Sequence, residues 1–322
     1  MTMKPHDQPQ TTDAPRPPHV GPSGTGADAG ASPGARSVVA GYDGSPQADR
    51  AIVVAGALFP AARGTIATVS HSAPPSPELL HEILNESERV TIDDLAARLR
   101  ELGEAQAGAT AERGAALARE QGWEAHGRVR HSHQGVWFEL VDLAREIAAE
   151  VVVLGADRGV GPLGRVTGAM VRILDRPVLV VREDAAIPAP DAPLVIGYDG
   201  SRHARQAISA AGALFPGRRA IVVHAGHLEL ADEGAQVAAD AGLDAEALRV
   251  PQALQDVVRP ESAAWHRLSA VADERGAALI VVGSRGTGAL RRFVLGSVTG
   301  GLLHHARRPV LVVPAPASDS TS

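Results

Sequence analysis

Four residues that could bind phosphate lie in residues 283–297, which read GSRGTGALRRFVLGS. Two residues separate Gly283 from Gly286, and nine more precede Gly296 and Ser297. Glycine allows backbone N–H groups to approach an anion closely, and a helix N-terminus adds unpaired N–H donors and partial positive charge. The spacing therefore predicts a cradle for a di- or triphosphate. The alternative is a flexible loop with turn glycines and an ordinary Ser N-cap.

This loop lies between an apolar run, 278–282, and a helix-compatible run, 298–305, which predicts a strand, a loop and a helix in that order. Arginine suits bidentate phosphate contacts, so Arg285, Arg291 and Arg292 are candidate phosphate ligands. Solvated loop arginines are the alternative, and they are favoured for Arg291.

A second candidate group, Asp199, Gly200 and Ser201, follows the apolar run 194–197. The carboxylate of Asp199 could accept a hydrogen bond from a ribose hydroxyl or lie near a base. Asp and Ser are also good helix N-caps, and the two roles are compatible. The turn lacks the GxGxxG spacing of dinucleotide-binding proteins.

The chain contains two copies of one unit. SVVAGYDGS at 37–45 matches PLVIGYDGS at 193–201, AGALFP occurs at 55–60 and 211–216, and RPVLVV occurs at 176–181 and 308–313. Self-similarity on this scale predicts a duplicated domain. We expect a disordered Pro/Gly-rich tail over 1–36, unit one over 37–184, unit two over 193–314 and a loose C-terminus over 315–322.

Within each unit, short apolar runs alternate with helical patterns. In unit one the predicted strands are 38–41, 65–70, 124–130, 151–154 and 178–181. Strands that are apolar along their whole length and alternate with helices indicate a parallel sheet covered on both faces. Ligands of such sheets bind beyond the carboxyl ends of the strands, where both the Asp199 turn and the glycine loop are expected.

Composition excludes several functions. The net charge of −6 argues against a main function in nucleic-acid binding. The chain has no Cys, and its one Lys is Lys4, so thiolate catalysis, a P-loop and a Schiff-base lysine are excluded. No stretch approaches ~20 uninterrupted apolar residues, and residues 1–36 contain no signal-peptide core. We expect a cytoplasmic protein without a membrane span.

Histidines offer weaker hypotheses. His131 and His133 could form a metal pair, but no third ligand is evident, so loop histidines are favoured. His71 and His224 end the second strand of each unit, where a structural role is favoured over a general base. The sequence shows no acid–base pair, and we expect no catalytic residue.

The spacing from Gly283 to Ser297, followed by Val298, Thr299 and the RPVLVV strand, resembles the ATP-binding motif of the universal stress protein family. VIGYDGS at 195–201 also matches the first strand of that family. The resemblance covers 37–313 as two tandem units. It implies an α/β fold of two Rossmann-like (adenine nucleotide alpha hydrolase-like) domains. Each would be a five-stranded parallel sheet of order 3-2-1-4-5 with helices on both faces.

The resemblance also implies that the protein binds ATP, with or without Mg. Asp199, with Gly200 and Ser201, would lie by the ribose and base, and Ala225 would offer its backbone to the adenine. The residues that would hold the ribose and phosphates are Gly283, Arg285, Gly286, Gly296, Ser297, Val298 and Thr299.

Unit one departs from this motif. Three residues separate Gly155 from Gly159, and only four separate Gly159 from Gly164. Arg165 replaces the motif Ser, and Asp157 adds negative charge. We therefore expect no triphosphate in unit one, although Arg165 leaves a weaker or different nucleotide site open.

Three functions fit the sequence. The first is an ATP-binding stress-response regulator with slow or no hydrolysis, acting mainly through unit two. The second is a nucleotide-independent interaction module, in which the units pack as a pseudo-dimer through their fifth strands and a homodimer or another protein is the partner. The third is an ATP-cleaving enzyme of the same superfamily, disfavoured by the lack of Lys and of an evident base.

Overall fold

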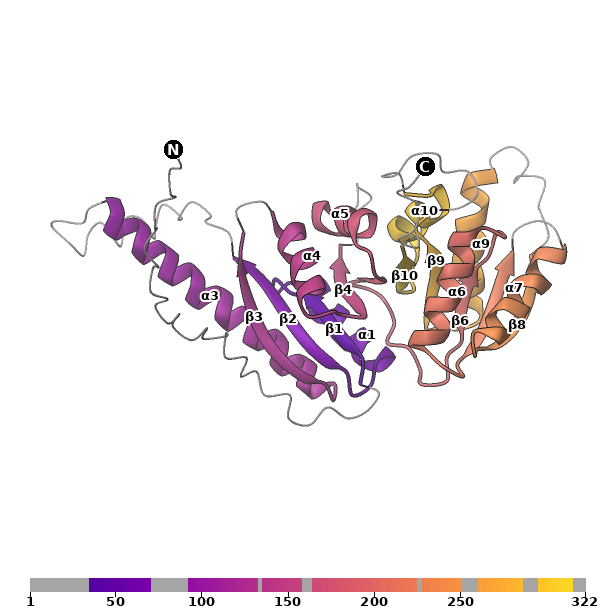
Figure 1. The fold of residues 1–322 in the computed structure, drawn as a ribbon, viewed down its shortest axis with the longest axis horizontal. Coiled ribbons are helices and arrows are strands. Elements are labelled where there is room, and N and C mark those ends of the chain that lie inside the picture. Colours follow the sequence, from indigo (N-terminus) through magenta and orange to yellow (C-terminus); the bar gives the residue numbers. More distant parts are fainter. Residues whose placement is uncertain are drawn as a thin grey trace, which may run out of the picture. The chain divides into compact units, whose positions relative to one another are not determined.

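The structure is a computed structural model that describes residues 35–70, 92–132, 135–157, 164–224, 228–250, 260–285 and 295–314. Most of each unit lies within this part of the chain (Figure 1). The predictions for the tail 1–34, the C-terminus 315–322 and several single residues lie outside the described residues. These single residues are His71, His133, Gly159, Ala225, Gly286, Arg291 and Arg292.

Each unit consists of five strands that alternate with helices. The elements of unit one are β1 (Ser37–Gly41), α1 (Pro46–Leu58), β2 (Arg63–Ser70), α3 (Ile92–Glu120), β3 (Glu124–His131), α4 (Val136–Glu146), β4 (Val151–Ala156), α5 (Arg165–Ile173) and β5 (Val178–Arg182). The elements of unit two are β6 (Leu194–Gly197), α6 (Arg202–Leu214), β7 (Arg219–His224), α7 (Leu228–Asp240), β8 (Asp244–Arg249), α9 (Pro260–Glu274), β9 (Leu279–Gly283), α10 (Ser297–His305) and β10 (Val310–Val313).

The strand order confirms the predicted fold. The sheet runs β3-β2-β1-β4-β5-β10-β9-β6-β7-β8, so each unit has the order 3-2-1-4-5. Within a unit every pairing is parallel, while β5 and β10 pair antiparallel. Leu179 lies opposite Leu311, its counterpart in the other copy. The fifth strands are therefore related by a local two-fold, which is the contact that a pseudo-dimer requires.

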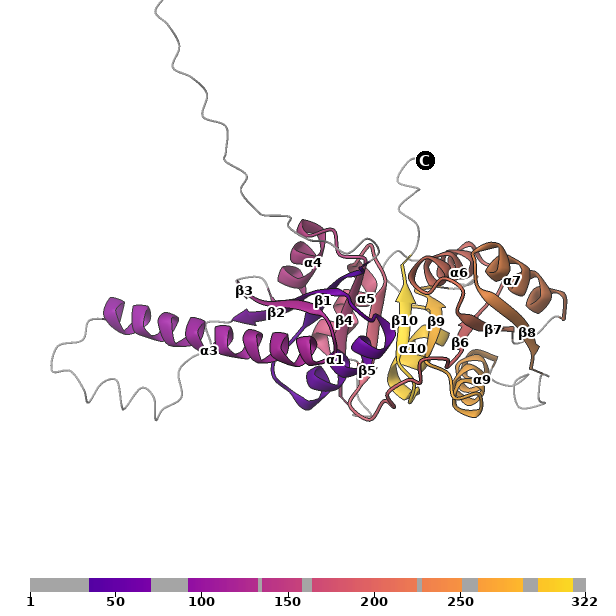
Figure 2. The same cartoon turned by 90° about the horizontal axis from the view of Figure 1, so that it is seen from below.

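Burial on both faces explains why the strands are apolar throughout. Alternate residues of one strand join different clusters: Leu194 and Ile196 belong to the cluster that includes residues of α6, and Val195 belongs to the cluster that includes residues of α9 and α10. Phe59 and Phe215, equivalent residues that follow α1 and α6, stack with ring centroids 5.2 Å apart. Figure 2 shows helices on both sides of the sheet. The core of each unit thus lies in two layers, one on each face.

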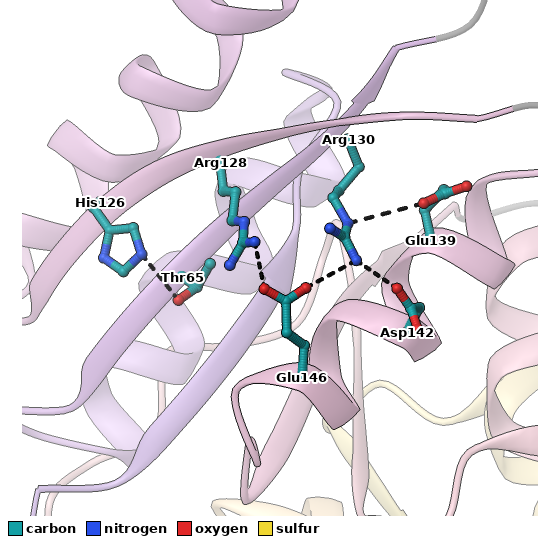
Figure 3. Close-up of polar contacts among 7 residues, drawn as sticks. All are labelled: Thr65, His126, Arg128, Arg130, Glu139, Asp142 and Glu146. Atoms are coloured by element: carbon teal, nitrogen blue, oxygen red, sulfur yellow. Dashed lines mark hydrogen bonds and ion pairs between the residues drawn. The ribbon is translucent and has the colours of Figure 1, made fainter. Parts of the chain in front are cut away.

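Ion pairs join β3, the edge strand of unit one, to α4 (Figure 3). Arg130 of β3 contacts Asp142 at 2.6 Å and Glu146 at 3.1 Å, and Arg128 contacts Glu146 at 2.5 Å. These α4 carboxylates lie on one face of the helix. Arg128, and then Arg130, lower the pKa of Glu146. The network holds α4 against β3 and explains the basic composition of this strand.

Candidate functional site

The candidate site lies at the carboxyl ends of β6 and β9, which are adjacent and parallel. From β6 the chain passes through α6 to β7 on one side, and from β9 it passes through α10 to β10 on the other. The connections therefore diverge between these two strands. In doubly wound sheets this point is where a crevice for a ligand opens.

The turn after β6 has a well-defined local structure. Gly200 has a φ of +78°, a conformation that favours glycine. The Oδ1 atom of Asp199 accepts a hydrogen bond from the N–H of Ser201 at 3.0 Å. The Oγ atom of Ser201 accepts one from the N–H of Ala204 at 3.1 Å, so Ser201 is the N-cap of α6. The capping role that the sequence suggested is present, and Asp199 stands at the end of the strand where a ribose was expected.

Gly283 is the point at which β9 meets the first turn of α6. A Cβ atom there would lie 2.9 Å from the carbonyl oxygen of His203 and 3.0 Å from its carbonyl carbon. Such distances are too short for a backbone neighbour that cannot move aside. Gly283 is therefore required for close packing between helix and strand, a role that the phosphate interpretation did not include.

Two hydrogen bonds tie the start of α10 to the end of β9. The buried hydroxyl of Thr299 donates to the carbonyl oxygen of Gly283 at 2.7 Å. The N–H of Gly296 donates to the carbonyl oxygen of Ser284 at 3.0 Å. Thr299 thus uses its hydroxyl to position the helix, which leaves its N–H as the group to offer a ligand.

Ser297 does not cap α10. The N-cap is Gly296, with φ −60° and ψ 147°, and no side chain makes the capping hydrogen bond. The interpretation of Ser297 as an ordinary N-cap is wrong, because the helix starts one residue earlier than that role requires. Ser297 is instead the first helical residue and its side chain is exposed. The first N–H groups of a helix have no acceptor within it, so this end of α10 suits an anion.

His203, in the first turn of α6, is a candidate site residue that the sequence analysis did not identify. Its Nε2 atom is buried and has no hydrogen-bond partner. Burial lowers the pKa of His203, and the positive charges of Arg202 and Arg285 lower it further. The charge of Arg285 therefore acts at the start of α6. Gln47 occupies the matching position of unit one, and this difference between the copies was the available signal.

Tyr198, the residue that precedes Asp199, is held by several contacts. Its hydroxyl donates to Glu233 of α7 at 2.7 Å, and the guanidinium of Arg205 lies 5.9 Å from the centre of its ring. The Nδ1 atom of His224 lies 2.7 Å from the carbonyl oxygen of Tyr198, consistent with the structural role favoured for that histidine. Tyr198 is therefore held through both its ring and its backbone.

We expect Tyr198 to ionise at a pH well above the ordinary pKa of tyrosine. Burial, followed by the hydrogen bond to Glu233, raises its pKa to about 12. Since only the folded protein opposes ionisation, this stabilisation is present below pH about 10 and is lost as the pH rises through the folded pKa. The chain has two tyrosines, so tyrosinate absorbance resolves them when Tyr198→Phe is the control. A Tyr198 signal that titrates as in guanidinium-unfolded protein would contradict this geometry.

Unit one retains the same scaffold. The hydroxyl of Thr167 lies 3.5 Å from the carbonyl oxygen of Gly155, and α5 has Gly164 as its N-cap. A Cβ atom at Gly155 would lie 2.6 Å from the backbone of Gln47. At this position the two copies differ in the loop sequence, including Arg165 at the first position of α5.

Among the described residues, no three His, Asp or Glu side chains form a metal-binding group. In the same part of the chain, no helix is long and apolar enough to cross a membrane.

The strand order and the divergence of the connections between β6 and β9 define a tandem, doubly wound α/β protein. The model of the universal stress protein family matches residues 34–182 and 192–314, together most of the chain. The chain belongs to the universal stress protein family.

Two sequence relatives agree with this assignment. Universal stress proteins of Mycobacterium bovis and Mycobacterium tuberculosis are each 34% identical to this chain over 198 residues, which cover 54% of this chain and 64% of theirs. The match thus spans slightly less than two thirds of these relatives. A crystal structure of a universal stress protein from Archaeoglobus fulgidus has the same fold, with a TM-score of 0.63 at 16% identity, and covers 86% of this chain and 98% of that one. A universal stress protein solved in complex with cAMP is 25% identical, with a TM-score of 0.32, and covers 45% and 96%.

Proposed function

We propose that unit two binds one molecule of ATP, with or without Mg²⁺, and that the protein acts as a stress-response regulator with slow or no hydrolysis. The observation that carries this proposal is the tie between Thr299 and Gly283 at 2.7 Å. It holds the N-terminus of α10 beside the end of β9, the strand adjacent to the one that leads into Asp199.

The two ends of the crevice offer different chemistry. On the β6 side, Asp199 supplies a carboxylate that suits ribose hydroxyls. On the β9 side, the N–H groups of Ser297, Val298 and Thr299 begin a helix, and Arg285 adds positive charge near α6. Backbone donors together with a guanidinium are a suitable environment for a polyphosphate. A carboxylate on the nucleoside side and positive charge on the phosphate side match the polarity of ATP.

Slow turnover is part of the proposal. Neither unit contains Lys, and the sequence offers no acid–base pair at the carboxyl ends of the strands. General acid–base groups typically contribute about 10²–10⁴-fold in rate, so we expect a bound nucleotide to persist. Regulation would then follow occupancy of the site rather than chemistry.

The interaction module is the second candidate, and the antiparallel pairing of β5 with β10 favours it. That pairing gives the chain a two-fold arrangement without any nucleotide. A homodimer or another protein partner would add to this arrangement, and neither requires an occupied crevice. The two candidates differ in whether ATP binds at all.

Calorimetric titration with ATP and with a non-hydrolysable analogue, each with and without Mg²⁺, tests the proposal. We expect both nucleotides to bind with similar affinity, because binding does not depend on cleavage. Absence of heat and of a thermal shift with either nucleotide would favour the interaction module. Rapid release of ADP or AMP would instead show that the protein is an enzyme.

A further inference from the structure

The two units build the same cluster around the same tyrosine, but with the charges exchanged between helices. In unit two, Glu233 of α7 accepts hydrogen bonds from the Tyr198 hydroxyl, at 2.7 Å, and from Arg205 of α6. A second nitrogen of Arg205 donates to the carbonyl oxygen of Gly200 at 2.8 Å. The first helix thus supplies the cation and the second helix supplies the anion.

In unit one these sources are reversed. Asp49 of α1 accepts a hydrogen bond from the Tyr42 hydroxyl at 2.5 Å, and Arg113 of α3 donates to that hydroxyl at 3.1 Å. Arg113 also donates to the carbonyl oxygen of Gly44 at 2.8 Å. Asp49 occupies the α1 position that matches Arg205, because each lies seven residues after its tyrosine.

Both units share a set of contacts around the Asp-Gly-Ser turn, although the charges come from different helices. In both units a carboxylate accepts from the tyrosine, and a guanidinium lies near its ring, at 5.7 Å in unit one and 5.9 Å in unit two. In both units the guanidinium binds the carbonyl oxygen of the glycine in the Asp-Gly-Ser turn. That glycine has a φ of +80° in unit one and +78° in unit two. The shared outcome is a fixed turn, whichever helix provides the arginine.

Ion-pair strength alone does not account for this convergence. The side chains of Arg205 and Glu233 are 48% and 41% exposed, and ion pairs at such exposure contribute little to stability. Their geometric effect is larger, because the Gly200 carbonyl lies between Asp199 and the Ser201 cap. A shift there would move both the carboxylate and the start of α6.

We propose that Arg205, Glu233 and Tyr198 form a positioning cluster that fixes the Asp199 turn for nucleotide binding, and that either direction of the ion pair serves. This proposal rests on the proposed function, because its readout is ATP affinity. None of the three residues needs to touch the nucleotide. Their effect passes through the carbonyl oxygen of Gly200 and the backbone of Tyr198.

The test is a charge-exchange cycle read by ATP calorimetry: Arg205→Asp, Glu233→Arg and the double variant, which copies the arrangement of unit one. Each single variant should weaken ATP binding about tenfold, and the double variant should return to within about threefold of the unmodified protein. Simple attraction to the triphosphate predicts the opposite for Glu233→Arg, since that variant adds positive charge. Tighter or unchanged binding by Glu233→Arg would overturn the proposal.

Matched controls come from the exposed pair Arg219 and Glu246, whose side chains are 51% and 48% exposed and 3.3 Å apart. Arg219 starts β7 and so lies at the amino ends of the strands, away from the Asp199 turn at the carboxyl ends, so Arg219→Asp and Glu246→Arg should leave ATP affinity unchanged. If a charge-reversed variant fails to fold, Glu233→Gln replaces it and should weaken binding about threefold, with Glu246→Gln as its control.

The outcomes separate the two proposals. Binding by the unmodified protein, with no recovery in a folded double variant, overturns the positioning cluster alone. An unmodified protein that binds no ATP overturns the proposed function, and the positioning proposal with it.

Discussion

Replacement of Gly283 by alanine should weaken ATP binding at least about tenfold and destabilise the protein by about 1–3 kcal/mol. The added Cβ atom would lie 2.9 Å from the carbonyl oxygen of His203, so α6 must move away from β9. That movement separates Asp199 from the loop after β9 and strains the carbonyl that Thr299 binds. Chemical denaturation gives the stability change, and calorimetry at a temperature where the variant is folded gives the affinity.

Gly155→Ala is the matched control in unit one. Its Cβ atom would lie 2.6 Å from the backbone of Gln47, an even closer approach. We therefore expect at least an equal loss of stability, but ATP affinity close to that of the unmodified protein. If both alanine variants lose ATP binding equally, the loss reflects general destabilisation and the site assignment to unit two is wrong.

Ser297→Arg should abolish detectable ATP binding. Ser297 is exposed at the first position of α10, so any larger side chain there occupies the approach to the helix N-terminus. Arginine is also the residue that unit one carries at the matching position, Arg165. The loss should exceed about a hundredfold, because the helix N–H groups and the loop act on the same phosphates. Titration of the folded variant with ATP measures it.

Ser297→Ala separates the two contributions of this residue. It removes the hydroxyl but keeps the helix N-terminus open, so we expect a loss of only about threefold to tenfold, the effect of one hydrogen bond. The converse variant, Arg165→Ser, should not create a second site, because unit one keeps its shortened loop. Unchanged affinity in Ser297→Arg would show that the phosphates do not bind at α10.

The fold could be predicted from the sequence because the chain contains two copies of one unit, which can be compared with each other. The repeated segments located the five strands of unit one and several of their counterparts in unit two, and the apolar strands indicated a sheet covered on both faces. The order 3-2-1-4-5 came from the family resemblance rather than from periodicity, and the structure confirms it in both units. The antiparallel contact between Leu179 and Leu311 depends on long-range packing, for which the sequence could offer only a hypothesis.

The site was predictable in outline and not in its supporting contacts. The sequence identified Gly283 as a glycine of importance, but its contact with His203 depends on how α6 packs on β9. Spacing could not show that Gly296, and not Ser297, is the N-cap, since a one-residue shift in a helix start leaves the pattern unchanged. The cluster around Tyr198 was not predicted. When the copies are aligned, Arg205 matches Asp49 and Glu233 matches Arg113, and these pairs of opposite charge look like unrelated surface variation. Ala225 and Gly286 stay predictions.

The number of ATP molecules bound per chain tests the central claim most directly. Native mass spectrometry of the folded protein with saturating ATP gives this number, and the same measurement on Ser297→Arg assigns the site. We predict one ATP per chain in the unmodified protein and none in the variant. Two ATP molecules per chain, or one that persists in Ser297→Arg, would contradict the account in which unit two alone holds the nucleotide.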